Sequence, residues 1–176
     1  FEGHERMRLY LLNRVAKWGN NDPEVDALGK RIADWYCDKV HSFTNARGGG
    51  CQAALFTLVF AWEGGRLTGA LPDGRRARES LAPDVGASYG RDKNGVTAVM
   101  RSVAKIDSTR LPNGAVLGVT LHPTAISGED GLDAFVTLIK TFFSLGGYAL
   151  QFNVFDVETL RDAQRHPEKY ASLQIR

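Results

Sequence analysis

The sequence has little of three features that would point to a class of protein at once: cysteine, charge of one sign, and long apolar runs. Its 176 residues include two cysteines, Cys37 and Cys51, which form no CxxC pair. A disulfide scaffold or a cysteine zinc site is therefore not expected, and reduced thiols indicate a cytoplasmic protein. The formal net charge of +2 gives no electrostatic reason to expect nucleic acid or a membrane as a partner.

Apolar segments and histidines add two further exclusions. The longest apolar run, residues 53–62, has ten residues and is interrupted by Thr57, whereas a transmembrane helix needs about 20. We interpret this run as a core element. The four histidines, His4, His41, His122 and His166, lack any ligand spacing such as HExxH, so no metal site is predicted.

What the sequence does contain is a regular alternation of helical and strand patterns. Asp22 followed by Pro23 is typical of a helix start, because an Asp cap and a proline both suit the first turn. The hydrophobic spacing predicts helices at 22–41, 94–106, 128–144 and 157–165, and buried strands at 53–62, 115–121 and 148–154. Helices between strands predict one α/β domain.

The side chains that could take part in catalysis also have structural explanations. His122, which comes directly before a proline, is interpreted as a structural cap rather than a catalytic group. The acids Asp73, Asp84, Glu129, Asp156 and Glu158 fall mostly at turn and cap positions. No convincing Cys–His dyad can be identified, and the triple glycine at 48–50 precedes a predicted strand instead of the helix that a phosphate loop needs.

Three longer segments, taken together, resemble a known family. They are TGALPDGR at 68–75, NGVTAVMRSVAK at 94–105, and GGYALQFN at 146–153, which continues through TLRDAQ at 159–164 and HPEKY at 166–170 to LQIR at 173–176. These segments are similar to the C-terminal part of the glycyl radical enzymes, the group that contains pyruvate formate-lyase.

The resemblance implies a fold. Members of the family form a ten-stranded α/β barrel made of two half-barrels. Residues 1–176 resemble part of the second half-barrel with its outer helices, and no separate second domain is expected. A strand with helices outside and packed side chains or ligand inside is apolar on both faces, as the run at 53–62 is.

The resemblance also implies a mechanism whose radical residues lie outside this sequence. In the family the third segment leads into an R-V-x-G motif; Arg176 matches its arginine, and the radical glycine would follow about three residues later. Neither Cys37 nor Cys51 matches the family's thiyl cysteine. We expect no catalytic residue and no bound cofactor in this chain, and no lyase activity of the chain alone. In the intact enzyme, an iron–sulfur activating enzyme that uses S-adenosylmethionine installs the glycyl radical, and the thiyl abstracts a hydrogen from a small organic substrate.

Candidate site residues follow from the expected strands. One alternating set, Gln52, Ala54, Phe56 and Leu58, or the opposite set, should form the wall of the substrate pocket. Gln151 and Asn153 should share a face of the third strand and, with Arg176, contact the glycine loop. Buried amides need partners, which either that loop or other parts of this chain would supply.

The amino-acid sequence of these segments resembles dehydratases and other lyases of the family more than formate acetyltransferase. The expected partners are the remainder of the enzyme, the activating enzyme, and a second copy in a homodimer. A different interpretation is a non-catalytic auxiliary protein, a detached half-barrel that binds another subunit. Such a chain would expose apolar strands and associate.

Overall fold

The computed structural model describes residues 15–55, 65–72, 76–79, 84–88 and 90–170. Its elements, in chain order, are α2 (Pro23–His41), α4 (Gly95–Val103), a 3-10 turn (Ser108–Arg110), β1 (Val116–Leu121), a 3-10 helix (Pro123–Ile126), α5 (Gly128–Ser144), β2 (Ala149–Val154) and α6 (Val157–Arg165). The α/β class predicted from the sequence is confirmed.

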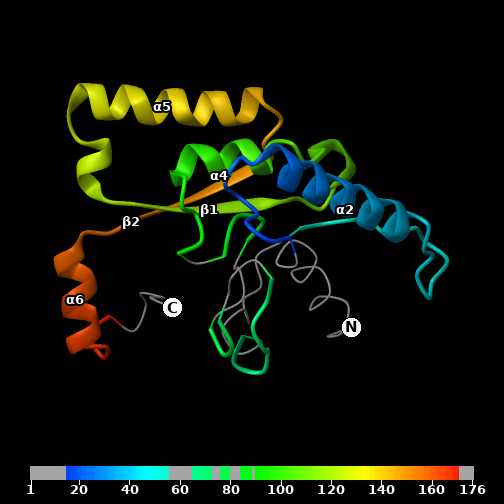
Figure 1. Cartoon of the computed structure of the whole chain (residues 1–176), viewed down its shortest axis with the longest axis horizontal. Helices are drawn as coiled ribbons and strands as arrows, with labels where there is room; N and C mark the ends of the chain where they lie inside the picture. The colour runs from blue at the N-terminus through cyan, green and yellow to red at the C-terminus, as the bar shows by residue number, and fades with distance from the viewer. Residues whose placement is uncertain (1–14, 56–64, 73–75, 80–83, 89, 171–176) are drawn as a thin grey trace.

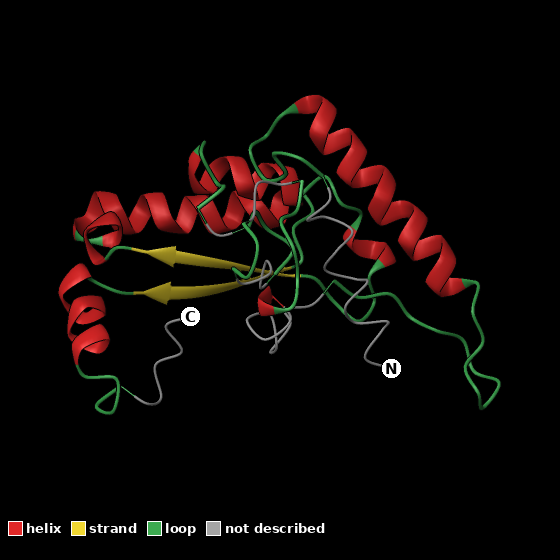
Figure 2. Cartoon of the chain, turned by 60° about the horizontal axis from the view of Figure 1, so that its bottom comes forward, coloured by secondary structure: helices red, strands yellow, loops and turns green. Residues whose placement is uncertain are grey.

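Strands β1 and β2 form a parallel pair. Their register runs from Val116 opposite Ala149 to Leu121 opposite Val154, and α5 makes the connection between them. Helices α4 and α5 lie on one side of this pair, while α6 follows beyond the carboxyl end of β2 (Figures 1 and 2). Parallel strands need a crossover of this kind, because a tight hairpin can join only antiparallel neighbours.

Helix α2 begins where its capping residues predict. The Asp22 carboxylate accepts hydrogen bonds from the amides of Glu24 and Val25, at 3.0 and 3.2 Å, and Pro23 occupies the first turn. These amides have no acceptor inside the helix, so the side chain satisfies them. The helix runs to His41, as the hydrophobic spacing indicates.

The turn between α5 and β2 depends on two glycines. Gly146 has a φ of +99°, in the left-handed region that favours glycine, and the Gly147 amide donates to the Phe142 carbonyl at 3.0 Å. A Cβ at Gly147 would lie 2.2 Å from the ring of Phe142, which is itself buried. The turn therefore packs directly on the core before β2 begins.

The core joins α2, α4 and β1 to the loop before α4. Trp18 is 3% exposed, and its indole Nε1 donates to the Val85 carbonyl at 2.9 Å. Leu111, Leu117 and Phe142 are among the largest fully buried side chains. No helix among the described residues is both long enough and apolar enough to cross a membrane.

The predicted strand at 53–62 is only partly described. Residues 53 and 54 belong to no strand, so the prediction is wrong there, whereas Leu55 forms a parallel bridge with Ala115 at the start of β1. Gln52 is exposed, while Ala53 and Ala54 are both buried, so Gln52 and Ala54 do not share one environment. The backbone of this stretch is held instead by a loop contact, since the Asn113 amide donates to the Ala53 carbonyl. Residues 56–62 lie outside the described part of the chain.

Candidate functional site

The β1–β2 pair has one apolar and one polar face. Phe152 of β2 packs edge-on against Phe135 of α5, with ring centroids 4.8 Å apart, so its face is covered by that helix. Because successive side chains alternate across a strand, Gln151 and Asn153 lie on the opposite face. Gly118 and Thr120 of β1 are their partners in the register. The two amides therefore point away from α5.

Neither the Gln151 nor the Asn153 side chain forms a hydrogen bond with the described residues. Gln151 is exposed and Asn153 is half-buried, and no side-chain hydrogen bond to either is formed within the described part of the chain. Fully buried amides without partners would be unfavourable. Among the described residues, the side-chain donors and acceptors of Gln151 and Asn153 are therefore left without a protein partner.

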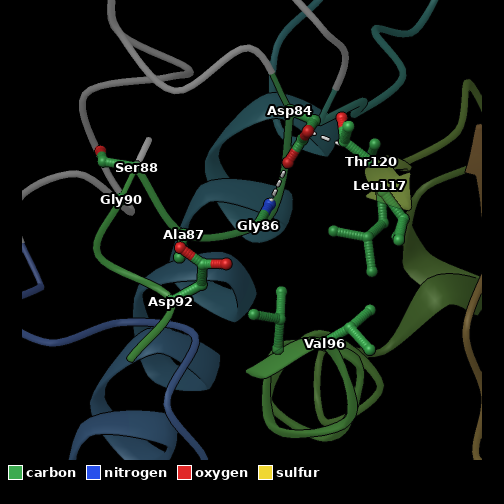
Figure 3. Close-up of a pocket in the computed structure, with 12 residues that line it drawn as sticks. Asp84, Gly86, Ala87, Ser88, Gly90, Asp92, Val96, Leu117 and Thr120 are labelled. Atoms are coloured by element: carbon green, nitrogen blue, oxygen red, sulfur yellow. Dashed lines mark hydrogen bonds between the residues drawn. The ribbon is translucent and has the colours of Figure 1, made fainter. Parts of the chain in front are cut away.

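A buried carboxylate borders the same face. The Gly86 amide donates to Asp84 Oδ1 at 2.5 Å, and the Gly118 amide donates to Asp84 Oδ2 at 3.0 Å (Figure 3). A Cβ at Gly118 would lie 2.7 Å from Oδ2, so the carboxylate fills the space that a side chain of β1 would take. The Val85 amide also donates to the Val116 carbonyl, which joins this loop to the strand edge.

Burial changes the acid–base behaviour of this group. Asp84 is 9% exposed, and its burial raises the pKa of the carboxyl to about 6, although the amides of Gly86 and Gly118 oppose the shift by stabilising the anion. A carboxyl with a pKa near 6 can accept or donate a hydrogen bond near neutral pH. Such a group in a cleft is a candidate for a functional role.

The carboxylate opens onto a cavity of about 220 Å³. Ser88 and Asp92 line it from the loop, Val96 from α4, and Leu117 and Thr120 from β1 (Figure 3). Its walls therefore combine apolar side chains with a few polar ones. This is smaller than the pockets of roughly 300–1,000 Å³ that hold drug-sized ligands, so it suits a molecule of a few heavy atoms.

The residues proposed from the sequence are only partly brought together. Gln52 and Ala54 do not line the cavity beside Asp84, and Phe56, Leu58 and Arg176 lie outside the described residues. Sequence reasoning placed Asp84 among turn and cap acids and missed its burial. The signal that could have found it is the glycine two residues after it, which allows an aspartate to accept its own loop's amide.

Other candidates turn out to be structural. The His122 Nδ1 accepts a hydrogen bond from the Thr124 amide at 3.3 Å, which confirms the predicted cap. His166 lies at the end of α6, again as predicted. Burial raises the pKa of the Cys37 thiol, which disfavours the reactive thiolate. No group of three potential metal ligands occurs within the described ranges.

Protein-family profiles match both halves of the chain. A profile described as "Glycine radical" matches residues 81–176, and one described as "Pyruvate formate lyase-like" matches residues 1–61. The chain belongs to the glycyl radical enzyme family. The resemblance to this family is thereby confirmed, and the segments at 94–105 and 146–176 lie inside the glycine radical match.

Three similar proteins illustrate the range of the family. A solved structure described as 1,2-propanediol dehydration in Roseburia inulinivorans is 43% identical with a TM-score of 0.82, over 99% of this chain and 22% of that chain. The trans-4-hydroxy-L-proline dehydratase of Clostridioides difficile is 32% identical over all of this chain and 22% of its own length. The indoleacetate decarboxylase of Tractidigestivibacter scatoligenes is 38% identical over 91% of this chain and 18% of its own length. The chain therefore spans about a fifth of these relatives.

Proposed function

We propose that this chain is the C-terminal barrel portion of a glycyl radical enzyme that removes a hydrogen atom from a small organic substrate. The observation that carries the proposal is the match of residues 81–176 to the glycine radical profile. In the intact enzyme, the glycyl radical supplies hydrogen abstraction through a cysteine thiyl, and an activating enzyme with an iron–sulfur cluster and S-adenosylmethionine installs it. Residues 1–176 then form a single half-barrel segment of a larger cytoplasmic homodimer.

The reaction class that we favour is dehydration of a small hydroxylated molecule. This rests on the 43% identity to the protein of the 1,2-propanediol dehydration structure, over nearly the whole chain. The 38% identity to a decarboxylase makes decarboxylation the second candidate within the lyases. The small cavity beside Asp84 supports a compact substrate in either case.

The role of this chain is to build the wall on which the glycine loop lies. The polar face of β2 offers Gln151 and Asn153, which have no side-chain partner among the described residues. A loop of backbone passing over this face would satisfy both amides, and Arg176 would lead into it. Phe56 and Leu58, or the opposite set of that run, would contribute to the pocket wall, whereas Gln52 and Ala54 are not proposed for it, because residues 53 and 54 belong to no strand and Gln52 is exposed. Apolar packing behind the strands, such as Phe152 on Phe135, excludes water from that interior.

The first test measures whether the intact protein holds a radical. It is incubated without oxygen with an activating enzyme and S-adenosylmethionine, and the glycyl signal is followed by electron paramagnetic resonance, with 1,2-propanediol as the trial substrate. We expect a glycyl doublet and substrate consumption. Absence of the doublet would refute the proposed function and favour the auxiliary protein that binds another subunit.

The second test concerns the amide face. Asn153→Ala in the intact protein should lower the yield or lifetime of the radical while the barrel stays folded, because one lost buried hydrogen bond shifts a loop equilibrium by about 1–3 kcal/mol. Gln164→Ala removes an exposed amide on α6 and is the matched control. If Asn153→Ala stores as much radical for as long as the control, the loop assignment is wrong although the function stands.

A further inference from the structure

A second cavity, of about 600 Å³, lies where the loop before α2 meets the loop before α4. It shares no lining residue with the cavity beside Asp84. Its volume is within the range of roughly 300–1,000 Å³ that is usual for small-molecule sites. Nothing in the radical mechanism uses it.

Positive charge dominates this cavity. Lys17, Arg91 and Lys93 line it, and Asp22 is the one carboxylate in its lining. Asp22 is already engaged, because its Oδ1 accepts the first amides of α2. Among the described residues, none of the three cations takes part in an ion pair. Within the described ranges, the positive charge of this lining is therefore not compensated by an ion pair.

The Arg91 side chain has one hydrogen-bond donor without an acceptor among the described residues. Its Nε is buried and has no hydrogen-bond partner in the described part of the chain. A buried N–H of a charged group without an acceptor is unfavourable, and such groups in folded proteins are nearly always paired. Since this Nε is closed off from solvent, an acceptor oxygen reaches it only after the Arg91 side chain shifts, whereas other atoms of Arg91 already line the cavity.

The frame around the cations is held firmly by two asparagines. Asn20 Nδ2 donates to the Arg91 carbonyl at 2.9 Å, and Asn20 Oδ1 accepts from the Asn94 amide at 3.2 Å. In return, Asn94 Nδ2 donates to the Asn20 carbonyl at 2.9 Å. These bonds join segments more than 70 residues apart, so the backbones of the two loops that carry the cations are held together before any ligand arrives. A site arranged in advance loses less entropy on binding.

We propose that this cavity binds a phosphate group, either as the free ion or as part of a small phosphate ester. A guanidinium directs parallel N–H groups at phosphate oxygens, and the two lysines act as point charges beside it. Binding here would stabilise the contact between the two loops, since each loop contributes a cation.

The test uses the intact protein and two probes, inorganic phosphate and glycerol 3-phosphate. Melting temperature and calorimetric affinity are measured at constant ionic strength, with chloride replacing phosphate in the reference. We expect a phosphate-dependent rise in melting temperature. Arg91→Gln should weaken binding about tenfold or more, because a hydrogen bond to a charged group is lost. Tighter binding of the ester than of the free ion would identify the ester as the ligand, and equal affinities would identify the ion.

Two variants keep the test decisive. The double variant Lys17→Gln, Lys93→Gln changes exposed side chains only and should also weaken binding, which covers the case that Arg91→Gln fails to fold. Lys39→Gln, an exposed lysine of α2 outside the cavity, should bind as wild type does. No effect of phosphate beyond chloride, or equal binding by all variants, would overturn the proposal. A loss of stability in Arg91→Gln without any phosphate response would also overturn it, because a carboxylate of the intact protein would then be the partner of Arg91.

Discussion

Gly118→Ala tests the contact between Asp84 and β1 most directly. An alanine in a strand interior is normally more stable than a glycine by about 0.5–1 kcal/mol, so propensity alone predicts a gain. The structure predicts the opposite sign. The new Cβ would lie 2.7 Å from Asp84 Oδ2, well inside contact distance, and the carboxylate cannot swing aside without leaving the amides of Gly86 and Gly118.

The size of the destabilisation depends on which hydrogen bond is lost when the Asp84 carboxylate is displaced. If the carboxylate moves, the hydrogen bond from the Gly118 amide is lost, and a hydrogen bond to a charged group contributes about 1.5–3 kcal/mol. After subtraction of the propensity gain, the net loss is about 0.5–2.5 kcal/mol. The loop at 84–88 should therefore open more often, with a tenfold rise in open population for each 1.4 kcal/mol or so.

Hydrogen exchange of the intact protein is the assay, read from peptides that cover 84–92 and 116–121. Gly50→Ala is the matched control, because a Cβ there meets nothing within 4 Å. In an Asp84→Ala background, Gly118→Ala should cause no further loss, since the clashing carboxylate is gone. If Gly118→Ala slows exchange in the wild-type background, or if its effect survives removal of Asp84, the reasoning is refuted.

Three other changes have definite outcomes. Because burial raises the pKa of Asp84 from 3.8 to about 6, the folded state binds more protons than the unfolded state between those values. The contribution of the protonated carboxyl to the free energy of unfolding, about 3 kcal/mol, is present below about pH 4 and lost as the pH rises through 6. Asp84→Asn should remove this pH dependence of the unfolding free energy, measured by urea titration at several pH values. An unchanged pH dependence in the variant would contradict the prediction. Gly147→Ala should lower the melting temperature through its 2.2 Å approach to Phe142, and an unchanged melting temperature would contradict that packing. Gly29→Ala, although favoured inside a helix, should also destabilise, because its Cβ would lie 2.3 Å from the ring of Trp18; a stabilised variant would show that the indole can move.

The elements predicted from the sequence are those with strong local signals. Helix α2 carries its own cap and proline, and α5 and α6 match the predicted ranges 128–144 and 157–165 because long amphipathic stretches end at glycine or proline. Strands β1 and β2 follow as short apolar runs between turns. The predicted helix at 94–106 ends at Val103 instead, and at 53–54 an apolar run is buried without pairing as a strand.

The sequence by itself determined the order of helices and strands, the alternation of Gln151 and Asn153 against Phe152, and the family, because all three depend on local spacing and ordered segments. Only the tertiary structure decided that Asp84 is buried beside Gly118 and that Lys17, Arg91 and Lys93 surround one cavity. These groups come from segments that are distant along the chain. The sequence immediately around each of them carries no pattern that would indicate its burial or its place in a cavity. Burial and proximity arise from packing between segments, so no local pattern carries them.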